Sequence, residues 1–205
     1  MAKQRIDIGG DPRGAALRAA EVFRAGGVVI FPTETVYGIG ALATDARAVE
    51  RLRDLKGRTA AKPFQFLVAD MDMARRMGAV FSSQAARLAR SFWPGPLTLV
   101  VPDGTASEGT LGVRVPDSEF VHALCRELGG AIVSSSANPG GEPPPIDSAA
   151  ADVFGDAVDL LVDGGKAVDG VPSTVVRCLE GNFEILRSGG LSDEQICAAW
   201  NGAIV

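Results

Sequence analysis

The sequence predicts an α/β fold with a twisted, mixed parallel/antiparallel sheet flanked by helices. Helical and strand patterns alternate in the first half of the chain, as they do where helices join parallel strands. Strand patterns then follow one another in the second half without room for helices between all of them, which favours antiparallel neighbours. The composition is that of a globular protein, with 46% hydrophobic and 22% charged residues. With 205 residues and no internal repeat, we expect a single domain over residues 1–205.

The helices are predicted from apolar residues at helical spacing, from polar caps at their start and from glycines after their end. The expected helical ranges are 11–24, 44–55 with Thr44-Asp45 as the cap, 82–92 and 118–128. The strands are predicted from short apolar runs between turn-forming residues. The expected strand ranges are 28–31, 64–69, 97–101, 111–115, 131–133, 160–162, 173–178 and 183–186.

The segment 138–146, Asn-Pro-Gly-Gly-Glu-Pro-Pro-Pro-Ile, is predicted to be a loop, because proline and glycine disfavour both helix and strand. The chain beyond it has about 60 residues, which is small for a separate core. We therefore expect a loop beside a site and not a linker between two domains.

The net charge, the hydropathy and the positions of the cysteines and the histidine limit which classes of function the protein can have. The formal net charge is -5, so nucleic acid should repel the molecule unless its basic residues gather on one face. No apolar run approaches a membrane span and the polar N-terminus lacks a signal-peptide pattern, so we expect a cytoplasmic protein with no membrane partner. Cys125, Cys178 and Cys197 lack disulfide or metal-site spacing and are expected in the core. His122 is expected to pack on a helix.

Two hydroxyl-rich segments leave predicted buried strands, where ligands of α/β sheets usually bind. Segment 31–38 holds two threonines, a glutamate and the only tyrosine, but it also fits a proline-initiated turn. Segment 134–138 can hold phosphate or carboxylate oxygens. A catalytic serine is the rival interpretation, yet the sequence lacks a G-x-S-x-G elbow and offers only His122 as a conventional base.

Cationic side chains occur at two further places. Lys56 and Arg58 follow a predicted helix, whose dipole favours positive charge there, while Lys62 adjoins a strand and suits a polyphosphate better. Arg114 lies inside an apolar strand, so it needs either an internal carboxylate or a bound ligand, and the sequence does not decide between them. Because no P-loop or dinucleotide motif is present, scattered cations and hydroxyls would have to hold phosphate.

The order of these motifs resembles the YrdC family of threonylcarbamoyl-AMP synthases, and the agreement runs from about residue 15 to 190. The matching segments are 32–38 (PTETVYG), 56–58 (KGR) with 62–63 (KP), 93–98 (WPGPLT), 113–116 (VRVP), 134–138 (SSSAN), 163–165 (DGG), 172–176 (PSTVV) and 186–187 (LR). Each motif alone is weak, but the ordered set is specific.

The resemblance implies a YrdC/RibB-like sheet with a large concave cavity. It implies that ATP, L-threonine and bicarbonate form threonylcarbamoyl-AMP and pyrophosphate, for modification of the adenosine beside the tRNA anticodon. Mg²⁺ is expected to enter with ATP, without an organic cofactor, and no metal ligands are assigned. Further expected partners are tRNA-modifying transferase proteins that receive the product, with possible tRNA or double-stranded RNA contact.

The resemblance also assigns residues to roles. Those matching contacts to threonine or its carbamate are Thr35, Arg114, Ser134 and Ser173. Those matching contacts to the nucleotide are Arg58, Lys62, Thr110, Ser136, Asn138, Pro144 and Arg187. Lys56 and Arg58 are the expected catalytic residues, acting by charge neutralisation without a protein nucleophile.

Two departures from the family pattern affect these expectations. Leu67 stands where related proteins often have a histidine, so that contact to threonine is either lost or replaced. Ser188 replaces a proline in the final Leu-Arg-Pro-Gly motif, and the chain is expected to be the short, single-domain form. The alternative functions are an RNA-binding module of the same fold, or a paralogue acting on a different carbamoyl substrate.

Overall fold

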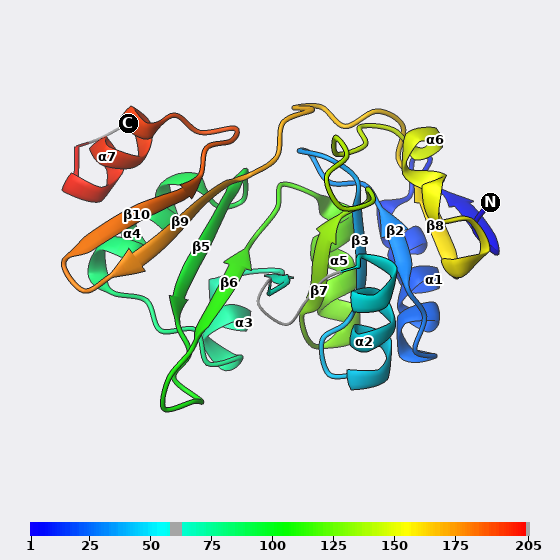
Figure 1. Cartoon of the computed structure of the whole chain (residues 1–205), viewed down its shortest axis with the longest axis horizontal. Helices are drawn as coiled ribbons and strands as arrows, with labels where there is room; N and C mark the ends of the chain where they lie inside the picture. Colours follow the sequence, from blue (N-terminus) through cyan, green and yellow to red (C-terminus); the bar gives the residue numbers. More distant parts are fainter. Residues whose placement is uncertain (58–62, 204–205) are drawn as a thin grey trace.

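The computed structural model describes residues 1–57 and 63–203, and it contains a mixed sheet of 10 strands among them (Figure 1). The order across the sheet is β1-β8-β2-β3-β7-β4-β6-β5-β9-β10. The strands are β1 Gln4–Asp7, β2 Val29–Phe31, β3 Gly38–Leu42, β4 Gln65–Leu67, β5 Leu97–Pro102, β6 Thr110–Arg114, β7 Ile132–Ser136, β8 Leu160–Asp163, β9 Thr174–Leu179 and β10 Asn182–Arg187.

The described helices lie along the flanks of this sheet. They are α1 Pro12–Arg24, α2 Ala46–Leu55, α3 Met71–Arg76, α4 Ser83–Phe92, α5 Glu119–Leu128, α6 Ser148–Ala151, the 3-10 helix Asp152–Ala157 and α7 Asp193–Asn201. The predicted caps Asp11, Asp45, Ser82 and Ser118 each accept a backbone N–H of the first turn. None of the described helices is long and apolar enough to cross a membrane.

The predicted mixed sheet is confirmed. β8 pairs in parallel with both β1 and β2, and the pairs β4–β6 and β5–β9 are also parallel. The pairs β2–β3, β3–β7, β4–β7, β5–β6 and β9–β10 are antiparallel. The four predicted helices and eight predicted strands are all present, with ends that differ by a few residues.

The elements that the sequence analysis missed are short or lack a strong local pattern: β1, β3, α3, α6, the 3-10 helix and α7. Strand β3 contains Gly38 and Gly40, which have low strand propensity, and it exists because it pairs on both sides with β2 and β7. Helix α7 does carry a sequence signal, since Ser192 and Gln195 form a capping box.

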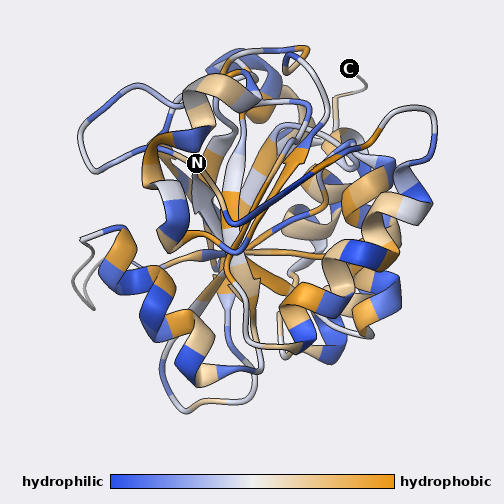
Figure 2. Ribbon diagram, turned by 90° about the vertical axis from the view of Figure 1, so that its right-hand side faces the viewer, coloured by the Kyte–Doolittle hydropathy of each residue, from blue (hydrophilic) through white to orange (hydrophobic). Residues whose placement is uncertain are grey.

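Strand β2 is buried on both faces, because alternate residues enter two different cores. Val29 and Phe31 belong to the larger core, which includes buried residues of α1 and α5, whereas Ile30 packs with Ala48 and Leu52 of α2 in the smaller one. In Figure 1, α1, α2 and α5 accompany β2, β3 and β7, and Figure 2 shows hydrophobic strands between helices whose outer faces are hydrophilic. This part of the fold is therefore layered on both sides.

In strands β5 and β6, alternate residues point into the larger core and into a cavity. Leu97, Leu99 and Val113 belong to the larger core, to which α4 contributes Leu88. The residues that alternate with them, Thr98 and Val100 on β5 and Gly112 and Arg114 on β6, line a cavity instead. The period of two along each strand thus gives this part of the sheet one apolar face and one face open to a ligand.

Candidate functional site

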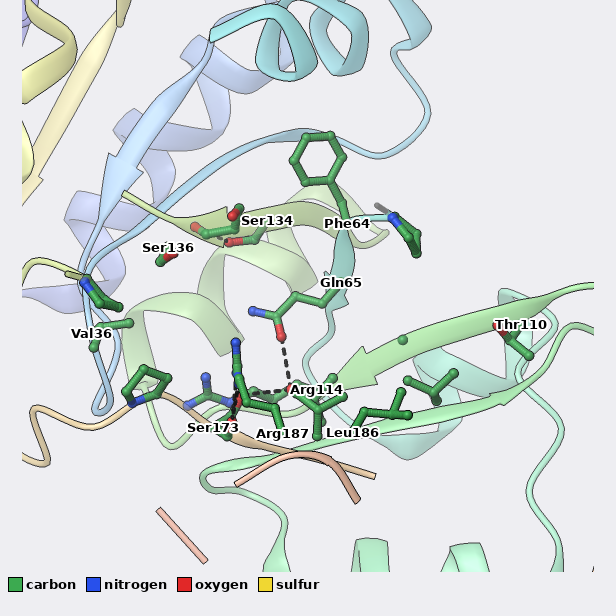
Figure 3. Close-up of a pocket in the computed structure, with 18 residues that line it drawn as sticks. Val36, Phe64, Gln65, Thr110, Arg114, Ser134, Ser136, Ser173, Leu186 and Arg187 are labelled. Atoms are coloured by element: carbon green, nitrogen blue, oxygen red, sulfur yellow. Dashed lines mark hydrogen bonds between the residues drawn. The ribbon is translucent and has the colours of Figure 1, made fainter. Parts of the chain in front are cut away.

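The cavity has a volume of about 260 Å³ and brings together segments that are far apart in the chain. Its described wall comes from β4, β5, β6, β7 and β9, from the end of β10 and from Pro144 in the predicted loop 138–146 (Figure 3). The polar side chains of this wall are Gln65, Thr98, Thr110, Arg114, Ser134, Ser135, Ser136, Ser173 and Arg187. They supply hydroxyl, amide and guanidinium groups and no carboxylate, so the described wall suits an anionic ligand.

Arg187, Ser173, Thr98 and Gln65 form a continuous hydrogen-bonded chain on this wall. Arg187 donates to the Ser173 carbonyl from Nε at 3.2 Å and from Nη2 at 2.6 Å, and Nη2 also lies 3.1 Å from Ser173 Oγ. Ser173 Oγ is 2.8 Å from Thr98 Oγ1, which is 2.9 Å from Gln65 Oε1. This series of hydrogen bonds runs from the end of β10 to β4. It fixes the positions of four polar side chains before any ligand binds.

Arg114 is buried and ion-paired. Its Nη2 lies 2.7 Å from Oε1 of Glu34, with side-chain exposures of 2% and 10%, and its Nε donates to the Gly95 carbonyl at 3.1 Å. The sequence left open whether a carboxylate or a ligand would neutralise this arginine. The structure supplies the carboxylate, and the same residue lines the cavity.

The Arg114–Glu34 contact depends on charge more than on hydrogen-bond geometry. Within the described parts of the chain, Arg114 Nη2 and both carboxylate oxygens of Glu34 have no hydrogen-bond partner, although Nη2 and Oε1 are close. Opposite charges attract strongly where water is excluded, so the pair holds the guanidinium at the cavity wall.

Lys56 is not on the described wall of the cavity. It is 6% exposed, and its Nζ donates to the carbonyls of Ser136, at 2.7 Å, and of Asn138. Its ammonium thus supports the backbone where β7 ends, in the second half of the serine-rich segment 134–138. Lys56 is expected from the resemblance to be a catalytic cation, but its ammonium contacts these carbonyls and is not on the described wall of the cavity.

Thr35 and Asn138 also lie behind the wall. Thr35 is fully buried, with its hydroxyl 2.9 Å from that of Thr33. Asn138 is 9% exposed and donates from its amide to the carbonyls of Pro139 and Glu142. Both residues shape the loops around the cavity, and neither is among the described residues that line it.

The remaining predicted contacts among the described residues lie on the wall. Ser134, Ser136 and Ser173 line the cavity together with Arg114 and Arg187, and Thr110 and Pro144 lie there as well. Arg58 and Lys62 fall outside the described residues. Arg114, Ser136 and Arg187, which come from distant segments of the chain, thus line one cavity.

Sequence reasoning missed Gln65 as a site residue, and it did not single out Thr98 within its motif. The available signal was a polar residue at an inward-facing position of an apolar strand, as in Leu-Thr-Leu at 97–99. Leu67 lies on the same strand as Gln65 but is 1% exposed within the core, and it is not part of the described wall.

Tyr37 belongs to a supporting network outside the cavity. Its hydroxyl donates to the Gly165 carbonyl at 2.7 Å and accepts the Gly164 N–H at 3.0 Å, which ties segment 31–38 to segment 163–165. Burial raises the pKa of the Tyr37 hydroxyl to about 12, so it stays neutral and serves as a structural hydrogen-bonding group. The family-like segments 32–38 and 163–165 are therefore joined by a structural hydrogen-bond network.

The cysteines and the histidine provide no alternative centre. Burial raises the pKa of the Cys125 and Cys178 thiols to about 12, which leaves them unreactive and confirms them as core residues. The expectation for Cys197 was wrong, because its side of α7 faces solvent. His122 is half-buried on α5, as expected for a packing role. Over residues 1–57 and 63–203, no three potential metal-ligating side chains come together.

The comparisons with known proteins agree with this architecture. The Sua5–YciO–YrdC family model, described as telomere recombination, matches residues 21–189. A threonylcarbamoyl-AMP synthase of Pyrococcus abyssi is 38% identical over 187 residues, which are 87% of this chain and 55% of that protein. A threonylcarbamoyl-AMP synthase of Chromohalobacter salexigens is 42% identical over 77% of this chain and 89% of its own.

A solved structure extends the likeness to three dimensions. The crystal structure of Pyrococcus abyssi Sua5 complexed with L-threonine superposes with a TM-score of 0.87 at 34% identity, covering 100% of this chain and 62% of that one. The chain therefore spans little more than half of the length of these Pyrococcus proteins. With the family model matched over most of its length and the same fold, this chain belongs to the Sua5–YciO–YrdC family.

Proposed function

We propose that this protein is an L-threonylcarbamoyladenylate synthase, which forms threonylcarbamoyl-AMP and pyrophosphate from L-threonine, bicarbonate and ATP. The observation that carries the proposal is the convergence of Arg114, Ser134, Ser173 and Arg187 on one cavity in a chain of this family. Two of the relatives reported above are threonylcarbamoyl-AMP synthases, and one solved relative is complexed with L-threonine.

In this proposal the amino acid occupies the part of the cavity next to Arg114. The guanidinium attracts the carboxylate of L-threonine, and the hydroxyl of Ser134 is available to its polar groups or to the carbamate. Ser173 Oγ lies on the same wall and can accept a hydrogen bond from the amine of the amino acid. Thr35 contributes through its hydrogen bond to Thr33, in the loop that also carries Glu34, the partner of Arg114.

The nucleotide occupies the part bounded by Arg187, Ser136, Thr110 and Pro144. In the proposal, Arg58 and Lys62 add positive charge for the phosphates. Lys56 and Asn138 act on this region from behind, through the backbone at the end of β7. Lys56 is thereby a positioning residue, and Arg58 remains the proposed catalytic cation.

The chemistry requires positioning and charge neutralisation more than a protein nucleophile. The amine of L-threonine adds to the carbon of bicarbonate with loss of water, which gives a carbamate. A carbamate oxygen then attacks the α-phosphorus of ATP, and the bond from that phosphorus to the leaving pyrophosphate breaks. Fixed cations and hydroxyls stabilise the charge that builds up on the phosphoryl oxygens.

Magnesium enters the proposal as part of the substrate, in the complex of Mg²⁺ with ATP. The described wall offers hydroxyl, amide and guanidinium groups but no carboxylate, which is a poor donor set for a resident Mg²⁺. The phosphates of ATP would therefore supply the ligands of the ion, and no step is assigned to a protein-bound metal.

The proposal extends to the surroundings of the enzyme. We place it in the cytoplasm, with residues 1–205 as one domain, and its product goes to transferase proteins that modify the adenosine beside the tRNA anticodon. A direct contact with tRNA or double-stranded RNA would need a local cationic surface, since the net charge is -5.

The test is release of pyrophosphate by the purified protein with each substrate omitted in turn. We expect release that requires ATP, L-threonine and bicarbonate together, and a product with the mass of threonylcarbamoyl-AMP. Release that is indifferent to omission of threonine or bicarbonate would overturn the assignment. Salt-sensitive retention of RNA without any pyrophosphate would instead favour the RNA-binding alternative.

A further inference from the structure

Gln65 carries the one carboxamide among the described side chains of the cavity wall. It lies on β4 between β6 and β7, in register with Gly112 on one side and Ser134 on the other. Gly112 has no side chain, so nothing from β6 covers the amide at this level. Arg114 follows two residues further along β6, which places it on the same face of that strand.

The hydrogen-bonded chain fixes which way the amide of Gln65 points. A guanidinium can only donate, so Arg187 Nη2 donates to Ser173 Oγ. Ser173 is 2% exposed, and its own hydrogen can reach Thr98 Oγ1, its other side-chain partner in the described structure. Thr98 is 3% exposed and then has one hydrogen left, which it gives to Gln65 Oε1.

This direction of donation turns the amide nitrogen of Gln65 away from Thr98. No described residue accepts a hydrogen bond from Nε2, and in Figure 3 the nitrogen extends into the cavity while the dashed line holds the oxygen. Reversing the amide would bring its NH₂ group to Thr98 and leave the hydroxyl hydrogen of either Ser173 or Thr98 without an acceptor, in a buried place where this is costly. Gln65 therefore presents a fixed donor to a ligand.

We propose that Gln65 is a specificity-determining residue, whose amide N–H donates to an anionic oxygen of the amino acid or its carbamate. The inference rests on the proposed function and names a contact within it. Gln65 lies next to Ser134 and near Arg114 along the sheet, which are the groups proposed for the amino acid. Thr98 is a positioning residue that acts through Gln65 by holding its oxygen.

The proposed contact from Gln65 would replace the one lost at position 67, where this chain has Leu67 and related proteins often have a histidine. Gln65 and Leu67 are two positions apart on one strand, but Leu67 is buried in the core, where it lies in register with Ile132. The polar contribution of β4 to the cavity therefore comes from Gln65.

The test compares Q65L, Q65E and T98V with the unsubstituted protein, measuring kcat and KM for each substrate and calorimetric binding of L-threonine without ATP. Q65L removes the donor, and loss of a hydrogen bond to a charged group should raise the KM and Kd for L-threonine about 10-fold or more. The KM for ATP should change by less than about twofold, because the nucleotide does not use this donor. Q65E should be worse than Q65L, since a carboxylate would repel the anionic oxygen.

T98V tests the positioning role. It should raise the KM for L-threonine less than Q65L does, and the double variant Q65L/T98V should be no worse than Q65L alone, because the contribution of Thr98 to L-threonine binding passes through Gln65. Loss of the hydrogen bond between Thr98 and Ser173 should appear in the melting temperature. Thermal melting of each variant shows whether it is folded. The matched control is Q4L, a glutamine-to-leucine change at an exposed position of the edge strand β1, which should leave all constants unchanged.

The outcomes separate this inference from the proposed function. If the unsubstituted protein neither binds L-threonine nor releases pyrophosphate, the proposed function fails and this contact fails with it. If the protein is active but folded Q65L and Q65E keep their affinity for L-threonine, or lose affinity for ATP alone, the specificity role of Gln65 is overturned. Additive effects of Q65L and T98V would remove the positioning role of Thr98.

Discussion

At the scale of single residues, the Arg114–Glu34 pair governs how the site can be tested. A buried ion pair is costly to break by removing one partner, because the other charge remains without compensation. Simple loss of activity in an Arg114 variant would therefore mix two effects, a missing substrate contact and an unpaired Glu34 in a water-excluded place.

We expect E34Q and R114M each to lower the free energy of unfolding by about 3 to 5 kcal/mol. The double variant E34Q/R114M should lose clearly less than the sum of the single losses, because neither charge is then left alone. Both variants that lack Arg114 should lose pyrophosphate release. Urea denaturation measures the stabilities.

The exposed pair Arg177–Glu184, with side-chain exposures of 43% and 53%, is the matched control for this cycle. The change E184Q should alter stability by less than about 1 kcal/mol, since exposed ion pairs contribute little. Strictly additive losses for E34Q and R114M would mean that the two charges do not support one another.

At the scale of elements, the end of β10 is held against the start of β9 by a close backbone approach at Gly189. A Cβ atom at this position would lie 2.3 Å from the Pro172 carbonyl oxygen and 2.5 Å from both Ser173 C and Thr174 N. Glycine is therefore required by space, and it lets Arg187 reach the Ser173 carbonyl. This gives a reason for the glycine in the Leu-Arg-Ser-Gly motif.

The change G189A should displace the backbone at Ser173, lower the stability by about 1 to 3 kcal/mol as overpacking does, and lower pyrophosphate release. The control is G10A, where a Cβ would meet nothing within 4 Å. Stability from urea denaturation and turnover should both be normal in G10A. A G189A protein with the stability and activity of the parent would show that the backbone there adapts freely.

At the scale of the whole molecule, two carboxylates stabilise one edge of the sheet: Asp159, just before strand β8, and Asp163, at its end. Asp159 accepts from Lys3, from Arg51 and from the N–H of Val28, and Asp163 accepts from Arg5. Burial raises the pKa of Asp159, but the hydrogen bonds from Arg51, Lys3 and Val28 outweigh it and hold the pKa below its ordinary value of 3.8. Burial also raises the pKa of Asp163, but hydrogen bonds from the Gly165 N–H and Arg5 outweigh this effect and hold the pKa below its ordinary value.

Because these pKa values are lower in the folded than in the unfolded chain, the stability they provide is present above about pH 4. It is lost as the pH falls through the folded pKa values. We expect urea midpoints to fall steadily on acidification below about pH 5. D159N should cost about 1 to 3 kcal/mol at pH 7 and flatten this acid-dependent loss, whereas a slope equal to that of the parent would exclude Asp159 as its source.

Most of the fold could be predicted from the sequence, because its determinants are local. A cap such as Ser118 and the spacing of apolar residues act within one or two turns, and alternation along Leu97–Pro102 separates core from cavity residues within one strand. Strand β3 could not be found in this way, since its glycines have no strand preference and its neighbours in the sheet create it.

By itself, the sequence determined the α/β class, the mixed sheet and the need of Arg114 for a negative partner, since a buried charge must be neutralised wherever it lies. Only the tertiary structure decided that the partner is Glu34, that Lys56 turns to the backbone of Ser136, and that Gln65 presents a fixed donor to the cavity. These are contacts between segments that lie far apart in the chain. Their geometry depends on the order and register of the strands, which no local pattern encodes.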